Sequence, residues 1–137
     1  MDTGYILIVD DDNDMCKVTA AVLRLEGFVV ACVSNGLDAL EYVVKNGVPT
    51  LVIADLTMPV MDGRQFLAER RKWLYLTQVP FVVLTASMNV SAEELGVAEV
   101  VHKPVHIDRL IAVARRYTSL SSGLYAAVER PKTKTGA

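Results

Sequence analysis

The sequence has few cysteines, little net charge and no long hydrophobic run, and each shortage excludes a class of protein. The two cysteines, Cys16 and Cys32, lack the close spacing of a zinc or redox pair, so we expect free, buried thiols. The formal net charge of -2 at pH 7 provides no overall attraction to nucleic acid or anionic lipid. We therefore expect a protein or small-molecule partner, with no direct contact with nucleic acid or membrane.

Targeting signals are also missing. Residues 1–12 contain only a short apolar run, with neither a basic start nor a small-residue cleavage site. No later run is long enough to cross a bilayer. These features predict a cytoplasmic protein.

What the sequence does contain is a series of short apolar runs rich in Val and Ile. Their nearly continuous hydrophobicity predicts strands covered on both faces, as in a parallel sheet. The candidate strands are Tyr5–Val9, Val29–Val33, Leu51–Ala54, Phe81–Leu84 and Glu99–His102. Amphipathic helical patterns lie between them, at about residues 15–25, 37–44, 62–70 and 107–117, with Asp62 as an expected N-cap. Because parallel strands need crossover connections, this alternation predicts a doubly wound α/β fold.

The composition changes after Thr118 to serines, glycine and a polar ending. The length of 137 residues suits one compact domain and leaves no room for a second. We therefore expect one domain over residues 1–118 and a flexible polar tail over residues 119–137.

Several carboxylates follow the candidate strands, at the sheet edge where doubly wound folds bind ligands. Asp10, Asp11 and Asp12 leave the first strand and Asp55 leaves the third. Two such charges about 4 Å apart repel by roughly 4 kcal/mol, so an acidic cluster tends to bind protons or a cation. Mg²⁺ suits the site because it binds through one or two carboxylates and reserves positions for phosphate oxygens. The alternative is that the acidic run 11–14 only caps the first helix.

Thr85 and Lys103 follow the fourth and fifth candidate strands. Each is ordinary by itself, since threonine favours strands and lysine is common on surfaces. Together with the carboxylates they add a hydroxyl and an ammonium at the same edge. This combination is what phosphoryl transfer to a carboxylate requires.

Five short motifs contain these residues. They are Ile6-Leu7-Ile8-Val9-Asp10-Asp11, Asp55-Leu56-Thr57-Met58-Pro59, Met61-Asp62-Gly63, Leu84-Thr85-Ala86 and Lys103-Pro104. In this order and spacing, over about residues 5 to 118, the chain resembles the response-regulator receiver family of two-component and phosphorelay signalling. The resemblance implies a flavodoxin-like, five-stranded parallel sheet in the order 2-1-3-4-5.

The resemblance also implies a role for each site residue. Asp55 would be the phosphoacceptor, supplied by a histidine kinase or a phosphotransfer protein, and Thr85 and Lys103 would bind the acyl phosphate. The implied Mg²⁺ ligands are Asp10, Asp11, Asp55 and the backbone carbonyl of Thr57. The chain would then be a signalling domain and not an enzyme, apart from self-directed phosphotransfer and autodephosphorylation. Phosphorylation would switch a surface that binds a downstream target protein.

Three features depart from the family pattern. Val100 and Val105 stand where the family usually has aromatic residues. The interval from Thr85 to Lys103 is shorter than usual by about one helical turn, which predicts a shortened fourth helix.

Three alternatives remain open from the sequence. The chain could be a receiver excised from a larger hybrid kinase or regulator. A haloacid-dehalogenase-type phosphatase would need a second aspartate two residues after the nucleophile, where Thr57 stands. A flavodoxin-like electron carrier would need a Ser/Thr/Gly-rich loop after the first strand, where this chain is acidic.

Overall fold

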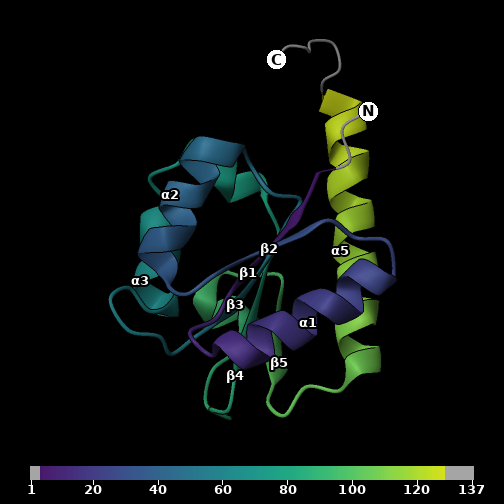
Figure 1. The fold of residues 1–137 in the computed structure, drawn as a ribbon. Coiled ribbons are helices and arrows are strands. Elements are labelled where there is room, and N and C mark those ends of the chain that lie inside the picture. Colours follow the sequence, from purple (N-terminus) through teal and green to yellow (C-terminus); the bar gives the residue numbers. More distant parts are fainter. Residues whose placement is uncertain (1–3, 129–137) are drawn as a thin grey trace.

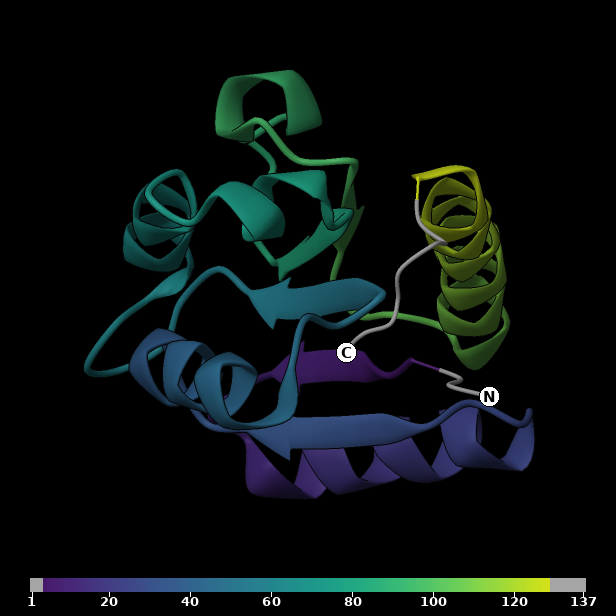
Figure 2. The same cartoon turned by 90° about the horizontal axis from the view of Figure 1, so that it is seen from above.

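The structure, a computed structural model, describes the backbone of residues 4–128 and the side chains of residues 4–118. Five parallel strands form one sheet in the order β2-β1-β3-β4-β5, with helices on both faces (Figures 1 and 2). The elements are β1 Ile6–Val9, α1 Asn13–Leu25, β2 Val30–Val33, α2 Gly36–Asn46, β3 Leu51–Asp55, α3 Gly63–Arg70, η1 Leu74–Gln78, β4 Phe81–Thr85, α4 Ala92–Leu95, β5 Glu99–His102 and α5 Ile107–Val128. The predicted fold class and strand order are confirmed.

The sheet separates two hydrophobic cores. Along β1, Leu7 and Val9 face the core shared with α2 and α3, whereas Ile6 and Ile8 face the core shared with α1 and α5. All four side chains are at most 2% exposed. Because both faces are covered, the strand needs an apolar residue at every position, which explains the unbroken hydrophobic run.

Polar caps fix where the helices begin. The Asp12 carboxylate accepts a hydrogen bond from the Met15 backbone N–H at 3.1 Å and caps α1. Asp62 caps α3 as predicted, and its partner Gln65 completes a reciprocal capping box. The caps matter for function because they set the direction of the chain where it leaves β1 and β3.

The expected shortened fourth helix is confirmed: α4 has four residues, between its N-cap Ser91 and the left-handed Gly96. Helix α5 continues to Val128, beyond the predicted end at Tyr117. A serine in a helix costs only roughly 0.5 kcal/mol relative to alanine. The serines among residues 119–122 therefore do not terminate α5. The flexible tail expected over residues 119–137 is therefore wrong for residues 119–128, which belong to α5, and its remainder, residues 129–137, lies outside the described residues.

The expectation of two buried thiols is half wrong. Both cysteines are free, but only Cys16 is buried and Cys32 is exposed. Cys32 lies on β2, the edge strand of the sheet, where a neighbouring strand covers one side only. Among the described residues, no helix combines the length and hydropathy that crossing a membrane requires.

Candidate functional site

The carboxyl ends of four adjacent strands meet at one edge of the sheet. Asp10 follows β1, Asp55 ends β3, Thr85 ends β4 and Lys103 follows β5. Since these strands are parallel and neighbour one another in the order β1-β3-β4-β5, their last residues are brought together. The structure therefore assembles the predicted site residues from segments that are far apart in the sequence.

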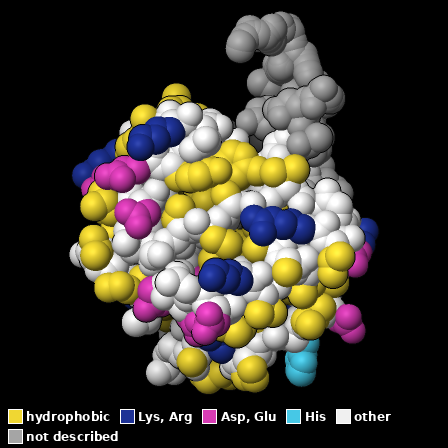
Figure 3. Space-filling view, viewed as in Figure 1, with side chains coloured by type: hydrophobic (Ala, Val, Ile, Leu, Met, Phe, Trp, Pro, Cys, Tyr) yellow, Lys and Arg dark blue, Asp and Glu magenta, His cyan; other side chains and the backbone are white. Residues whose placement is uncertain are grey.

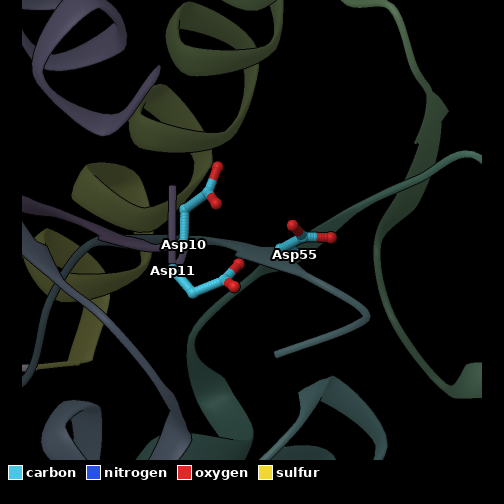
Figure 4. Close-up of side chains that lie close together, drawn as sticks. All are labelled: Asp10, Asp11 and Asp55. Atoms are coloured by element: carbon cyan, nitrogen blue, oxygen red, sulfur yellow. The ribbon is translucent and has the colours of Figure 1, made fainter. Parts of the chain in front are cut away.

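Three carboxylates form a compact acidic cluster at this edge. Asp10, Asp11 and Asp55 each place a carboxylate oxygen within 4.8 Å of the others (Figure 4). Asp10 and Asp55 are 8% and 7% exposed, and Asp11 is open to solvent. The arrangement supplies hard oxygen ligands on a partly open rim, which fits Mg²⁺.

Burial and charge together act on Asp10. Burial raises the pKa of Asp10 above its ordinary value, and the negative charges of Asp55 and Asp11 add to this effect. The hydrogen bond from the Asp12 backbone N–H to Asp10 Oδ1, at 2.9 Å, and the Lys103 charge oppose it. The cluster is thus a place where an added cation relieves repulsion.

Lys103 reaches into the cluster. Its Nζ donates a hydrogen bond to Asp55 Oδ2 at 2.9 Å, forming an ion pair whose lysine side chain is 38% exposed and whose carboxylate is 10% exposed. Burial alone would lower the pKa of Lys103, but the hydrogen bond and charge of Asp55 outweigh it and raise the pKa. The ammonium therefore stays positive at neutral pH.

Thr85 and Thr57 flank Asp55. Thr85 is 4% exposed, and its Oγ1 accepts a hydrogen bond from the Ser87 backbone N–H at 3.0 Å, which fixes the hydroxyl oxygen at the end of β4. The Thr57 backbone N–H donates to Asp55 Oδ1 at 3.4 Å, so Thr57 lies in the turn beside the carboxylate. The predicted use of the Thr57 carbonyl as a metal ligand stays a prediction.

The turn between β3 and α3 contains two residues whose structural role sequence reasoning missed. A Cβ on Gly63 would lie 2.7 Å from Leu56 Cα and 2.8 Å from the Asp55 carbonyl oxygen. Val60 has a positive φ of 65°, in the left-handed region that a β-branched residue rarely adopts. The glycine of the Met61-Asp62-Gly63 motif was a usable signal for the close approach, whereas nothing in the sequence marks Val60.

A groove of about 570 Å³ adjoins the acidic cluster. Its walls include Met15 and Val18 from α1, Ile107 from α5, and Lys103. On the face seen in Figure 3, hydrophobic side chains are exposed in several patches with lysine and arginine side chains between them. The acidic cluster therefore lies at the border of a groove between α1 and α5.

Comparison with known proteins defines the class. The family model described as the response regulator receiver domain matches residues 6–115, so the chain belongs to this family. Among solved structures, the receiver domain of NtrX from Brucella abortus is 31% identical, with a TM-score of 0.73 and coverage of 83% of this chain and 98% of that one. A putative response regulator from Chloroflexus aurantiacus is 28% identical, with a TM-score of 0.76 and coverage of 85% and 98%.

Curated relatives are longer than this chain. The transcriptional regulatory protein CpxR homolog of Haemophilus influenzae is 35% identical over an alignment of 127 positions, and the match covers 87% of this chain and 54% of that protein. ZraR of Klebsiella oxytoca is 36% identical over an alignment of 139 positions, and the match covers 96% of this chain and 29% of that protein. CheAY of Helicobacter pylori, a sensor histidine kinase, is 29% identical, and the match covers 84% of this chain and 15% of that protein. The chain thus spans about half or less of the length of these relatives, and it is a receiver domain of two-component signalling.

Proposed function

We propose that Asp55 accepts a phosphoryl group from a phosphohistidine of a histidine kinase or phosphotransfer protein. The observation that carries the proposal is the position of the Asp55 carboxylate, between the Lys103 ammonium at 2.9 Å and the carboxylates of Asp10 and Asp11. A carboxylate with a cation on one side and a cation-binding cluster on the other is placed to receive a phosphate whose charge both would neutralise.

In the proposed step, a carboxylate oxygen of Asp55 attacks phosphorus and forms a P–O bond. The P–N bond to the donor imidazole breaks, and the imidazole leaves with its electron pair and takes up a proton. Lys103 then shifts its hydrogen bond from the carboxylate to a phosphoryl oxygen, and the Thr85 hydroxyl donates to another. The donor docks at the rim because the acceptor carboxylate is itself part of the open edge of the sheet.

We further propose that the cation is Mg²⁺, held by Asp10, Asp11, Asp55 and the Thr57 carbonyl. When bound, Mg²⁺ supplies charge neutralisation for the carboxylates and for the transferred phosphate. The three carboxylates position it, because they come from two rigid strand ends that already lie next to each other.

Acetyl phosphate with MgCl₂ provides a direct test of the acceptor. We expect mass spectrometry to show one added phosphoryl group that hydroxylamine removes, as expected for an acyl phosphate, and no addition in Asp55→Asn. Asp108→Asn is the matched control, because Asp108 is an exposed carboxylate in the first turn of α5. Unchanged labelling of Asp55→Asn would place the acceptor elsewhere.

Calorimetry tests the metal site separately. We expect saturable Mg²⁺ binding by the unmodified chain and its loss in an Asp11→Ala, Asp55→Ala double variant. The Asp108→Asn variant should bind Mg²⁺ like the parent chain. Intact binding in the double variant would contradict the ligand assignment even if Asp55 accepts phosphate.

The proposed output is a change in a protein-binding surface, whether the chain acts alone or as part of a larger kinase or regulator. Val100 is half-buried in β5 and is too small for an aromatic rotamer switch. The segment Ser87–Gly96 begins two residues after Thr85 and has Leu95 as its one buried hydrophobic side chain, so little apolar packing holds it in place. Amide hydrogen exchange with and without beryllofluoride should show gained protection in residues 87–96. Equal, strong protection in both states would contradict this mechanism.

A further inference from the structure

Two thiols that are distant in the sequence meet between α1 and β2. Cys16 is 4% exposed and belongs to the core that α1 and α5 form with the sheet. Side chains alternate along a strand, so Cys32 lies on the same face of β2 as Val30, which packs in that core. The Cys32 Sγ donates to the Cys16 carbonyl oxygen at 3.4 Å, so the Cys32 sulfur lies against the residue that carries the second thiol.

The contact between α1 and β2 is held at a second point. Arg24 lies about two helical turns after Cys16 on α1. Its Nη2 donates a hydrogen bond to the Val30 carbonyl oxygen at 2.7 Å. Val30 is two residues before Cys32 on the same strand. The helix is therefore held against the strand at two points, which keeps Cys16 and Cys32 next to each other.

The two thiols differ in exposure and in acidity. Cys32 is exposed, and the hydrogen bond from the Cys16 thiol lowers the pKa of Cys32 to about 7, against the effect of burial and with help from the Arg24 charge. The same hydrogen bond, together with burial, raises the pKa of Cys16. Cys32 thus has the features of an attacking thiol, and the buried Cys16 those of a resolving thiol.

We propose that Cys16 and Cys32 are a site of reversible oxidation, at which a peroxide converts them into an intramolecular disulfide that joins α1 to β2. The Cys32 sulfur attacks hydrogen peroxide, the O–O bond breaks, and a sulfenic acid and one water result. The Cys16 sulfur then attacks the Cys32 sulfur, the S–S bond forms, and hydroxide leaves as a second water with the Cys16 proton. Two thiols are oxidised and one peroxide is reduced to two waters.

The oxidation does not require phosphorylation, because no hydrogen bond or ion pair found among the described residues joins either cysteine to Asp55. Its structural effect would be on α1, which begins directly after the acidic run Asp10–Asp12. A covalent link between α1 and the edge strand would hold the helix that forms one wall of the groove beside the cluster.

Peptide mapping of the full, reduced chain after treatment with hydrogen peroxide tests the proposal. Trypsin cleaves after Lys17, Arg24 and Lys45, so the link would join peptide 1–17 to peptide 25–45 under non-reducing conditions. We expect this joined peptide, the loss of both free thiols, and recovery of both with dithiothreitol. Recovery distinguishes a disulfide from irreversible oxidation.

Two serine variants assign the roles. Cys32→Ser should leave Cys16 as a free thiol, because the buried sulfur does not meet the oxidant first. Cys16→Ser should accumulate a dimedone-reactive sulfenic acid at Cys32 that the parent chain does not accumulate. A parent chain in which Cys32 is oxidised while Cys16 stays a thiol would overturn the proposal, and so would disulfides that join two chains. If Cys16→Ser does not fold, the peptide map of the parent chain decides alone.

Discussion

Lys103 Nζ lies 2.9 Å from Asp55 Oδ2, and this ion pair is the link between β5 and the acidic cluster at the end of β3. The pair is partly buried, so each charge depends on the other more than in an exposed pair. The Lys103 ammonium also lies directly beside Asp55, the proposed phosphoacceptor. Substitution of Lys103 therefore affects both stability and phosphoryl acceptance.

We expect Lys103→Ala to lower the free energy of unfolding by about 1 kcal/mol without Mg²⁺, since Asp55 then faces the other carboxylates without a cation. Labelling by acetyl phosphate should fall as well. Urea denaturation and mass spectrometry measure the two effects. Lys72→Ala is the control, because the Lys72–Glu69 pair has a lysine side chain that is 70% exposed and should contribute less than about 0.5 kcal/mol.

Asp10→Asn should separate stability from metal binding. Because burial and neighbouring charges raise the pKa of Asp10, the folded state binds a proton there more tightly than the unfolded state does. The protonated Asp10 side chain therefore adds to the free energy of unfolding at low pH. This contribution is lost as the pH rises from the pKa that Asp10 has in the unfolded chain through its higher pKa in the folded protein. At pH 7 without Mg²⁺, the amide should raise the free energy of unfolding by on the order of 1 kcal/mol.

The same variant should bind Mg²⁺ more weakly, because the amide keeps the oxygen that accepts from the Asp12 N–H but loses the charge. Denaturation at pH 7 and calorimetry measure the two quantities. Asp108→Asn should change neither. A variant that is less stable without Mg²⁺ would show that repulsion and burial at Asp10 are not the dominant effects.

Gly63→Ala should destabilise the turn that carries Asp55 into α3. The added Cβ would meet backbone atoms of Leu56 and Asp55, which cannot move aside as a side-chain end can. Overpacking of this kind costs about 1–3 kcal/mol, and we expect weaker Mg²⁺ binding with it. Gly27→Ala is the control: Gly27 has a φ of 98° and no atom near its Cβ position, so only backbone strain of about 1 kcal/mol applies.

Val60→Asn should stabilise the protein. Val60 is 73% exposed, so little burial is lost, while its φ of 65° is better tolerated by asparagine. Relief of the left-handed strain is worth about 1 kcal/mol, which thermal or urea denaturation can resolve. Val60→Thr removes the same hydrophobic surface but stays β-branched. Equal stabilisation by threonine would mean that polarity, and not backbone conformation, is responsible.

The sequence by itself determined the sheet and the location of the site. Strands buried on both faces require apolar residues at every position, so the sequence predicts the first and last residue of each strand to within about one residue. Asp62, a typical N-cap residue, marked the start of α3. Once the strands are parallel, their carboxyl ends share one edge, and Asp10, Asp55, Thr85 and Lys103 must gather there. These features follow from local patterns and from a topological rule.

Tertiary structure alone decided the contacts that depend on how one element packs on another. The Lys103–Asp55 distance requires the register of β3, β4 and β5, and the meeting of Cys16 with Cys32 requires the position of α1 against β2. The cysteines are 16 residues apart along the chain and meet only across a helix–strand interface, so their spacing in the sequence does not reveal the contact. The exposure of Cys32 likewise follows from the position of β2 at the edge of the sheet, which the pattern of its own residues does not specify.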